Sequence, residues 1–235
     1  VSDAMVDLLI SRGFRPDRLF SIYNGLDFTP RTPALSRQAY LESVGADWPE
    51  DCVIAGIAAR LNPVKDIATL IRGFAQAHEH CPRLRLLIAG DGELAGQLRA
   101  LARELGVAEE VCFAGWVTDT DSFYHALDIN TLTSLSETFP YALTEGARAG
   151  LPTVASDYGG NPWVIKDGEE GLLFPSRNAA ALADAMERLI QDGALREAMG
   201  RRALERFQRE FTGEVFARNT EKIYLDILKG ANHGT

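Results

Sequence analysis

Six short apolar runs, separated by segments of helical period, constrain the fold of this chain more than any other feature. They span residues 52–59, 84–89, 111–114, 129–133, 153–155 and 171–174. Runs of this length and composition are typical of strands that are buried on both faces. The helical stretches between them, such as 67–80 and 93–105, predict crossover connections. The sequence therefore predicts an α/β fold, a doubly wound parallel sheet covered by helices on both faces.

The segments outside this alternation predict further elements. A short helix at 2–10 with Ser2 as its N-cap is followed by a brief strand, Phe20–Tyr23, which the turn pair Asn24-Gly25 closes. Residues 28–34, with Pro30 and Pro33, predict a linker. Further helices are expected at about 35–45, 122–127, 178–190, 194–210 and 212–228, and Thr212 is the predicted cap of the last one.

Composition narrows the class of function. The chain has 235 residues, 46% of them hydrophobic, and a net charge of −9. No window is long and apolar enough to span a membrane, and no charged-then-apolar signal peptide is visible. The negative charge argues against nucleic acid as a main partner, because phosphate backbones require basic surface. The widely spaced Cys52, Cys81 and Cys112 match neither a disulfide framework nor a zinc site, so buried thiols and a cytoplasmic protein are expected.

Ligands of doubly wound sheets bind in loops at the carboxyl ends of the strands. The loop after the first run carries Arg60 and Lys65, two cations that suit an anionic ligand, although surface charges are the more common role for either residue alone. The loop after the second run is Gly90-Asp91-Gly92, where glycines either let the backbone approach a ligand or form an ordinary turn. It is not a G-x-G-x-x-G dinucleotide fingerprint.

The stretch Ser136–Pro152 contains the strongest candidate site. Glu137 and Glu145 are separated by seven residues, and Glu137 closely follows an apolar strand. Pro140 is expected at the first position of a helix, where its missing N–H costs nothing. The free N–H groups of that helix would point toward whatever lies over Glu137, and Glu145 would lie about one and a half turns further along the same helix.

The same stretch, SETFPYALTEGARAGLPTVASDYGG, resembles the E-x7-E region of family-4 glycosyltransferases, which are retaining enzymes of the GT-B fold. The similarity extends from about Val1 to about Leu228 and includes an NGxD motif at residues 24–27. It implies that the chain is the C-terminal, Rossmann-like half of such an enzyme, with extra C-terminal helices and with the N-terminal acceptor domain absent. Residues 1–27 would end the preceding domain, 28–211 would bind the nucleotide sugar, and 212–235 would form a crossover helix and tail.

The resemblance also implies roles for individual residues. Two cations would hold the donor diphosphate, one carboxylate would contact the transferred sugar, and a second would accept hydrogen bonds from the ribose. These are Arg60 with Lys65, Glu137 and Glu145, respectively. The backbone of Val117 would bind the nucleobase, with Asp119 at the base edge. Backbone N–H groups around Phe139, Pro140, Tyr141 and Ala142 would meet sugar hydroxyls and phosphate. One position departs from the family, which usually carries G-G-x-P-E: Trp163 stands in place of the glutamate.

The implied reaction is transfer of a hexose from a UDP- or GDP-sugar to a sugar or lipid-linked acceptor, with no cofactor and no metal. This half alone is expected to be inactive. The full enzyme would be cytoplasmic, with peripheral association at the inner face of the membrane as an option, and the exposed C-terminal helix would allow self-association. Two alternatives stay open: a nucleotide-binding module without transfer activity, and a sugar-nucleotide epimerase of similar architecture. Glu145→Ala is expected to weaken nucleotide binding.

Overall fold

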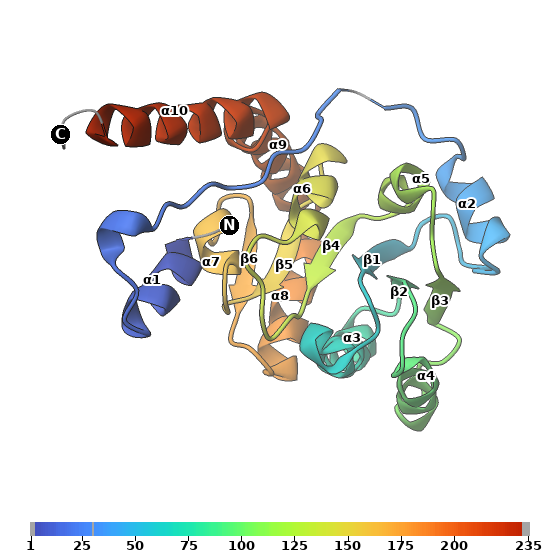
Figure 1. The fold of residues 1–235 in the computed structure, drawn as a ribbon. Coiled ribbons are helices and arrows are strands. Elements are labelled where there is room, and N and C mark those ends of the chain that lie inside the picture. The colour runs from blue at the N-terminus through green and yellow to red at the C-terminus, as the bar shows by residue number, and fades with distance from the viewer. Residues whose placement is uncertain (1–2, 30, 232–235) are drawn as a thin grey trace.

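The computed structural model describes residues 3–29 and 31–231 and contains one six-stranded sheet, in which every neighbouring pair of strands is parallel. The strand order is β3-β2-β1-β4-β5-β6 (Figure 1). The strands are β1 (Val53–Ala58), β2 (Leu84–Ala89), β3 (Val111–Gly115), β4 (Ile129–Leu132), β5 (Thr153–Ser156) and β6 (Gly171–Phe174). Each of the six runs predicted from the sequence is therefore a strand, and the doubly wound fold is confirmed.

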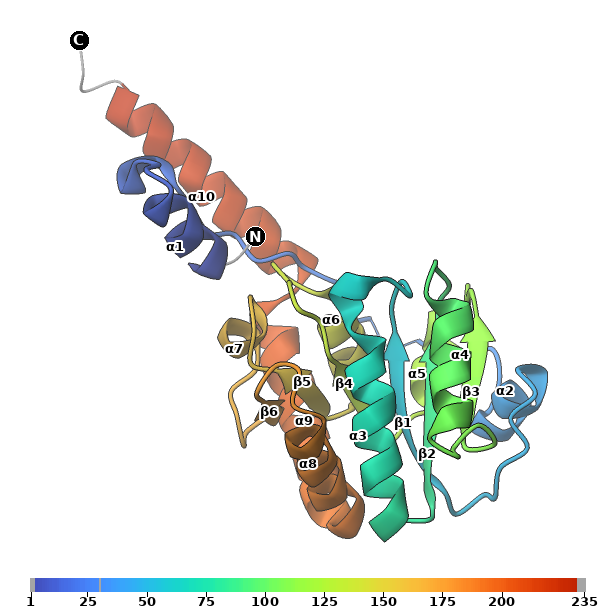
Figure 2. The ribbon, with the colours of Figure 1, turned by 90° about the horizontal axis from the view of Figure 1, so that it is seen from below.

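Helices cover both faces of the sheet (Figure 2). One face packs against α3 (Ile67–His80), α4 (Ala95–Glu104) and α8 (Ala179–Gln191). The other face packs against α2 (Arg37–Ser43), α5 (Thr120–His125) and α6 (Tyr141–Arg148). The long helix α9 (Gly193–Glu210) packs against both α6 and α8. These helices lie within a few residues of their predicted positions, and α3 has the predicted bounds.

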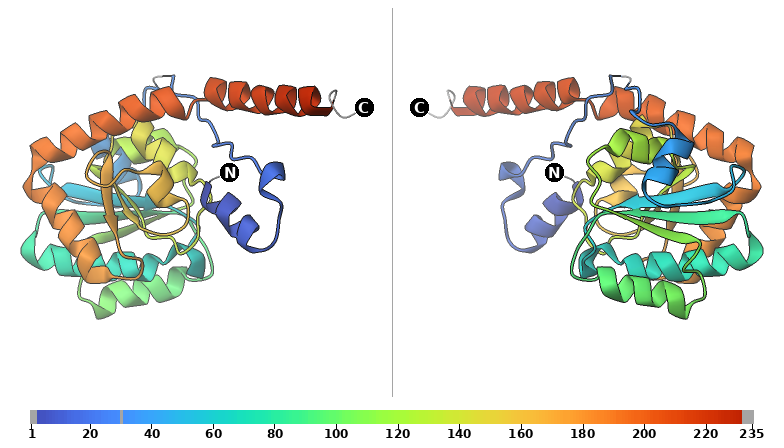
Figure 3. Two further views of the ribbon diagram at one scale, coloured as in Figure 1. Left: turned by 90° about the vertical axis from the view of Figure 1, so that its left-hand side faces the viewer. Right: turned by 90° about the vertical axis from the view of Figure 1, so that its right-hand side faces the viewer.

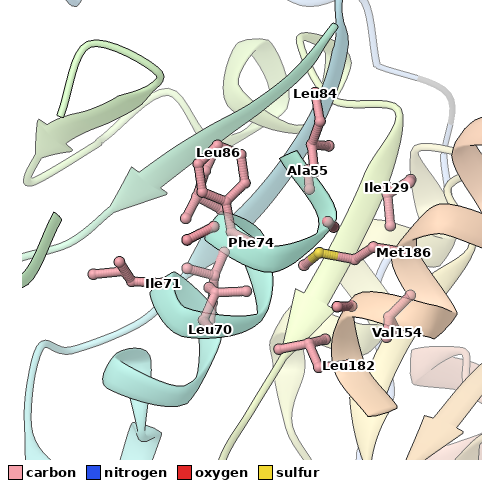
Figure 4. Close-up of a cluster of buried hydrophobic side chains, with 14 of the residues drawn as sticks. Ala55, Leu70, Ile71, Phe74, Leu84, Leu86, Ile129, Val154, Leu182 and Met186 are labelled. Atoms are coloured by element: carbon pink, nitrogen blue, oxygen red, sulfur yellow. The ribbon is translucent and has the colours of Figure 1, made fainter. Parts of the chain in front are cut away.

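The two-residue period of the strands divides the core between these two faces. Ala55 of β1 belongs to the cluster formed with Leu70, Phe74 and Met186 from the helices of the first face (Figure 4), whereas its neighbour Ile54 belongs to the cluster on the second face. Successive side chains of a strand point to opposite faces, so an uninterrupted apolar run fills both cores. All five of these side chains are fully buried.

The order of the strands reverses between β1 and β4, which are adjacent in the sheet although two strands separate them in the sequence. The chain winds from β1 outward to β3 and then returns to continue outward from β4. Crossover helices leave in opposite directions on the two sides of this point, which opens a crevice at the carboxyl ends of the strands. The loops that follow β1 and β4 therefore lie at the position where a sheet of this type binds ligands.

The two ends of the described chain lie beside the sheet domain. Helix α1 (Asp3–Ser11) and the short 3-10 helix Pro16–Arg18 precede the linker, and α10 (Gly213–Ala231) extends past the sheet (Figure 3). Thr212 caps α10 as predicted, because its hydroxyl accepts a hydrogen bond from the Val215 backbone N–H at 3.2 Å. Apolar side chains remain exposed on α10, including Tyr224, Leu225 and Leu228. No helix within residues 3–29 and 31–231 is long and apolar enough to cross a membrane.

A predicted strand and the turn that was expected to close it are both wrong, because Asn24-Gly25 forms no turn in the structure. Phe20–Tyr23 is not a strand, and the ladder contact nearest to it is a single bridge between Leu26 and Thr212. Extended backbone becomes a strand only where a neighbouring segment pairs with it. Tyr23 instead packs its ring against Phe139 and Phe211. The predicted cap Ser2 and the linker residue Pro30 lie outside the described residues.

Candidate functional site

The loop after β1 is fastened to the loop after β4 by its own backbone. It contains a 3-10 turn, Pro63–Lys65, which the Asn62 side chain caps by accepting a hydrogen bond from the Lys65 N–H at 3.3 Å. The Lys65 carbonyl accepts a hydrogen bond of 2.7 Å from the Thr133 hydroxyl, and the Val64 carbonyl accepts one of 2.7 Å from the Leu135 N–H. These bonds hold the base of the lysine side chain against the segment that leads to Glu137.

Lys65 and Glu137 form an ion pair at the reversal point of the sheet. Lys65 Nζ lies 2.5 Å from Glu137 Oε1, and the two side chains are 25% and 10% exposed. A partly buried pair of this kind is held more firmly than a surface pair, because solvent screens it less. The structure thus brings together two residues, 72 positions apart in sequence, that were predicted as parts of one site.

The glycine pair Gly159-Gly160 supports the backbone of Glu137 from the other side. The Gly160 N–H donates a 2.8 Å hydrogen bond to the Glu137 carbonyl, and Gly159 has a φ of +63°. A Cβ atom on Gly159 would lie 2.7 Å from the Glu137 carbonyl oxygen, and one on Gly160 would collide with the Thr138 carbonyl. Both positions therefore require glycine, and the loops after β4 and β5 form one packed unit rather than two independent turns.

The residues that follow Glu137 enter helix α6. Phe139 is buried, with ring centroids 5.8 Å from Tyr23 and 5.4 Å from Phe211, so its side chain anchors the loop. Pro140 is the N-cap of α6 with extended backbone angles, one residue before the predicted position. The helix begins at Tyr141, whose side chain is exposed, and Ala142 follows in the same first turn. The first N–H groups of a helix lack intrahelical acceptors and attract anions.

Arg60 and Val117 line a common hollow of about 210 Å³ at the carboxyl ends of β1, β2 and β3, together with Gly90, Trp116, Phe123 and others. Gly90 has a φ of +125°, and any Cβ there would collide with the Ala59 carbonyl, so this loop needs glycine for the close approach of two backbones. The structure places Asp119 as the N-cap of α5, since its carboxylate accepts a 3.0 Å hydrogen bond from the Ser122 N–H. Its role at a base edge stays a prediction.

Glu145 lines a different hollow, of about 260 Å³, between α5, α6, α9 and the linker. This hollow shares no lining residue with the one at Arg60 and Val117. Glu145 Oε2 accepts a 3.0 Å hydrogen bond from the buried Tyr124 hydroxyl. Burial raises the pKa of the Glu145 carboxyl, and burial together with the nearby carboxylate raises the pKa of Tyr124 well above its ordinary value. The structure therefore joins Lys65 with Glu137 and Arg60 with Val117, while Glu145 lies on the other side of α5.

Several charged neighbours of Glu145 were not predicted from the sequence. Arg148 forms a close ion pair with Asp121, and Arg31 from the linker lies 3.5 Å from the second carboxylate oxygen of the same aspartate. The Arg148 side chain is only 10% exposed. Arg148 follows Glu145 by three residues, so the two side chains lie on neighbouring parts of one helical surface. This spacing was the one feature of the sequence that could have indicated their proximity. The aspartate comes from α5 and the second arginine from the linker, and only the fold brings them together.

Trp163, the departure from the family pattern, lies on a four-residue helix, α7 (Asn161–Val164), that was not predicted. The Asn161 and Val164 side chains of this turn are buried, whereas Trp163 is 48% exposed. Behind it, the Val164 carbonyl accepts a 2.8 Å hydrogen bond from Arg206 of α9. In the part of the chain that the structure describes, no group of three or more His, Cys, Asp or Glu side chains is arranged to hold a metal ion. The three cysteines are free thiols.

Comparison with known proteins agrees with this architecture. The family described as "Glycosyl transferases group 1" matches residues 43–206. The D-inositol 3-phosphate glycosyltransferase of Corynebacterium aurimucosum is 32% identical over 230 residues, which cover 94% of this chain and 54% of that protein. The lipopolysaccharide core biosynthesis glycosyltransferase LpsE of Rhizobium meliloti is 33% identical, over 77% of this chain and 51% of its own length. The chain thus spans about half the length of these curated relatives.

Solved structures show the same fold. HepE of Anabaena, crystallised with UDP-glucose, superposes with a TM-score of 0.85 at 24% identity, over 95% of this chain and 62% of that one. The C-terminal domain of LpcC, a glycosyl transferase group 1 family protein of Francisella tularensis, superposes with a TM-score of 0.70 at 22% identity, over 80% of this chain and all of that one. The architecture is that of a GT-B C-terminal domain, and the chain belongs to the group 1 glycosyl transferases.

Proposed function

We propose that this chain binds the nucleotide-diphosphate-sugar donor of a retaining glycosyltransferase at the carboxyl edge of its sheet. The hollow lined by Arg60 and Val117 takes the nucleobase, Lys65 with Arg60 holds the diphosphate, and Glu137 faces the transferred sugar. The relative from Anabaena was crystallised with UDP-glucose, so UDP is the first nucleotide to try. The ribose role of Glu145, which the resemblance implies, stays a prediction, because Glu145 lines the separate hollow across α5 and its Oε2 already accepts from Tyr124.

One observation carries the proposal, which is the Lys65–Glu137 pair at the point where the strand order reverses. A cation and a carboxylate fixed 2.5 Å apart offer a donor sugar two complementary contacts. The lysine attracts phosphate oxygens, and the carboxylate accepts hydrogen bonds from sugar hydroxyls. Their mutual attraction keeps both side chains in place before the donor arrives, so little conformational freedom is lost on binding.

The proposed transfer needs no strong base from this chain. The acceptor hydroxyl oxygen forms a bond to the anomeric carbon while the bond from that carbon to the phosphate oxygen breaks. The bonding electrons leave with the diphosphate, and the hydroxyl proton passes to a phosphate oxygen on the same face. Arg60 and Lys65 stabilise the negative charge that develops on the diphosphate, and Glu137 stabilises positive charge near the anomeric carbon.

The experiment that tests this function is a thermal-shift panel of UDP, GDP and ADP and of their glucose and mannose derivatives. We expect one nucleobase series to raise the melting temperature, since a ligand that binds only the folded state stabilises it. Glu137→Gln should remove the additional stabilisation given by the sugar and leave that given by the nucleotide. No stabilisation by any of the compounds would contradict the proposal.

The same proposal includes a hexose as the transferred sugar, a sugar or lipid-linked molecule as the acceptor, and a cytoplasmic location. We expect donor binding without transfer by this chain alone, because acceptor contacts are assigned to a preceding domain. The free thiols Cys52, Cys81 and Cys112 fit a cytoplasmic enzyme, with a lipid-linked acceptor at the inner membrane face as one option. Transfer assays on a protein that includes the preceding domain, with sugar and lipid-linked acceptors, would test these points. They would also separate a transferase from an epimerase.

A further inference from the structure

The exposed aromatic side chains of the sheet domain gather at one edge. Between residues 37 and 211, four aromatic rings are exposed, and each follows the carboxyl end of a strand. Trp116 is 81% exposed after β3, Tyr141 is 51% exposed after β4, and Tyr158 and Trp163 are 54% and 48% exposed after β5. Every other Phe, Tyr or Trp ring of this range is buried or half-buried. All four rings thus lie on loops at the edge where sheets of this type bind ligands.

The order of the strands places these rings relative to the donor groups proposed above. Along the sheet edge, the tips of β3 and β2 carry the hollow next to Trp116, the tip of β1 carries Lys65, and the tip of β4 carries Glu137. The tip of β5 is next in line, and it carries Tyr158 and Trp163. A ligand laid along this edge, from base through diphosphate to sugar, would reach this pair of rings last.

The backbone under the two rings is fixed. Gly159 and Gly160, which follow Tyr158 directly, pack against the backbone of Glu137 and its neighbour. The Asn161 amide donates a 3.0 Å hydrogen bond to the Ser156 carbonyl, and the Trp163 N–H donates one of 3.2 Å to the Gly160 carbonyl. The turn that carries these two exposed rings is therefore packed, through its glycines, against the backbone of Glu137. An anchored turn of this kind presents aromatic surface without the entropy cost of ordering a loop.

We propose that Tyr158 and Trp163 form a subsite for a pyranose ring next to the transferred sugar. A pyranose presents C–H groups on the faces of its ring, and the negative face of an aromatic ring attracts such groups while excluding water. Because Trp163 and Tyr158 offer ring faces rather than charged groups, this subsite selects its sugar by shape and apolar contact. The location rests on the proposed donor site, whereas the aromatic pair does not depend on it.

The test uses the three tryptophans of the chain as separate probes. Labelling with 5-fluorotryptophan gives three ¹⁹F resonances, which single Trp→Phe variants assign to the buried Trp48, to Trp116 and to Trp163. The protein is titrated with UDP, with UDP-glucose, and with methyl glycosides of glucose, galactose and N-acetylglucosamine in the presence of UDP. Glycerol serves as the control for a polyol that has no ring.

The proposal predicts that a sugar moves the Trp163 resonance while leaving that of Trp48 in place. If UDP-glucose shifts the Trp163 resonance more than UDP does, the Trp163 ring contacts the donor sugar. If a methyl glycoside shifts it in the presence of UDP, the ring contacts the acceptor sugar. Tyr158→Ala should weaken the response by about three- to tenfold, the effect of one aromatic contact. Tyr224→Ala, which removes an exposed ring on α10, should leave it unchanged.

Three results would overturn the subsite. The Trp163 resonance could stay in place with every sugar, glycerol could move it equally, or Tyr158→Ala could leave the sugar affinity unchanged. Failure of the donor site is distinguishable from these results. If none of UDP, GDP and ADP moves a resonance or protects the protein from thermal unfolding while a glycoside still moves Trp163, the proposed donor function fails and the aromatic subsite stands.

Discussion

Removing either member of the buried ion pair between Glu170 and Arg206 should strongly destabilise the domain. Arg206 Nη1 lies 3.1 Å from Glu170 Oε2, and the side chains are 10% and 4% exposed for the arginine and the glutamate. The same arginine donates to the Val164 carbonyl at 2.8 Å and to Glu210 at 2.9 Å. Glu170 also accepts a 2.9 Å hydrogen bond from the Lys166 N–H. This pair thus fastens α9 to the segment that follows Trp163.

The expected loss in the free energy of unfolding depends on which buried charge each substitution leaves without a partner. Arg206→Met leaves Glu170 charged and buried without its cation, which typically costs about 3–5 kcal/mol. Glu170→Gln leaves the arginine with Glu210, which is more exposed, so we expect a smaller loss of about 2–3 kcal/mol. The double variant removes both charges and should cost less than the sum of the single ones by more than about 1 kcal/mol.

The assay is urea unfolding followed by far-ultraviolet circular dichroism, fitted for the free energy of unfolding and its denaturant slope. Arg209→Ala is the matched control, because its ion pair with Glu210 is largely exposed and should contribute no more than about 1 kcal/mol. Single losses below about 1 kcal/mol together with additive effects in the double variant would contradict this prediction. That result would mean that the pair is not buried as the structure has it.

Three further perturbations have definite expected outcomes. Gly160→Ala should lower the melting temperature, because the added methyl group would collide with a backbone carbonyl. Gly96→Ala, in an open helical position, should instead raise the free energy of unfolding by up to about 1 kcal/mol. Equal effects of the two variants in calorimetry would contradict this prediction. Burial raises the pKa of Glu145, so the folded state binds its proton more tightly than the unfolded state, and this contribution to stability is lost as the pH rises through the folded pKa. Glu145→Gln should therefore raise the melting temperature at neutral pH and lose that advantage near pH 4, and the reverse trend would show that the carboxylate is stabilised. Leu225→Glu combined with Leu228→Glu should abolish any concentration-dependent self-association in analytical ultracentrifugation, because both side chains are exposed on α10; unchanged association would exclude this helix as the contact.

The sheet and most helices could be predicted because their apolar residues follow the period of the element and are also the residues that the fold buries. The run at 52–59 is apolar at successive positions, and β1 is buried on both faces, so nothing competes with the sequence signal. Phe20–Tyr23 carries the same local signal, yet it forms no strand because pairing depends on a neighbour that the local sequence does not specify. Helix α7 has four residues, which is too short for a periodic pattern to be recognised in the sequence. Its first residue, Asn161, is buried, and the local sequence does not indicate that burial.

The candidate site was predictable in part for a related reason. Lys65 and Glu137 each follow an apolar strand, and strand ends of a parallel sheet share one edge, so their meeting could be expected. The hollow around Glu145 could not, because Arg31, Asp121 and Arg148 come from three separate segments whose approach depends on how α5, α6 and the linker pack. The need for glycine at positions 159 and 160 could not be predicted either, because only the neighbouring backbone shows why no side chain fits.

The most direct test of the donor site is isothermal titration calorimetry of nucleoside diphosphates against the wild-type chain and the Arg60→Ala/Lys65→Ala variant. Two charge-assisted contacts to phosphate contribute roughly 1.5–3 kcal/mol each, so the variant should bind at least about a hundredfold more weakly. The corresponding nucleoside, which lacks the diphosphate, should lose much less affinity than the diphosphate, since only Arg60 of the two residues lines the hollow proposed for the base. We expect this selective loss, and unchanged affinity of the double variant for the diphosphate would contradict the proposed donor site.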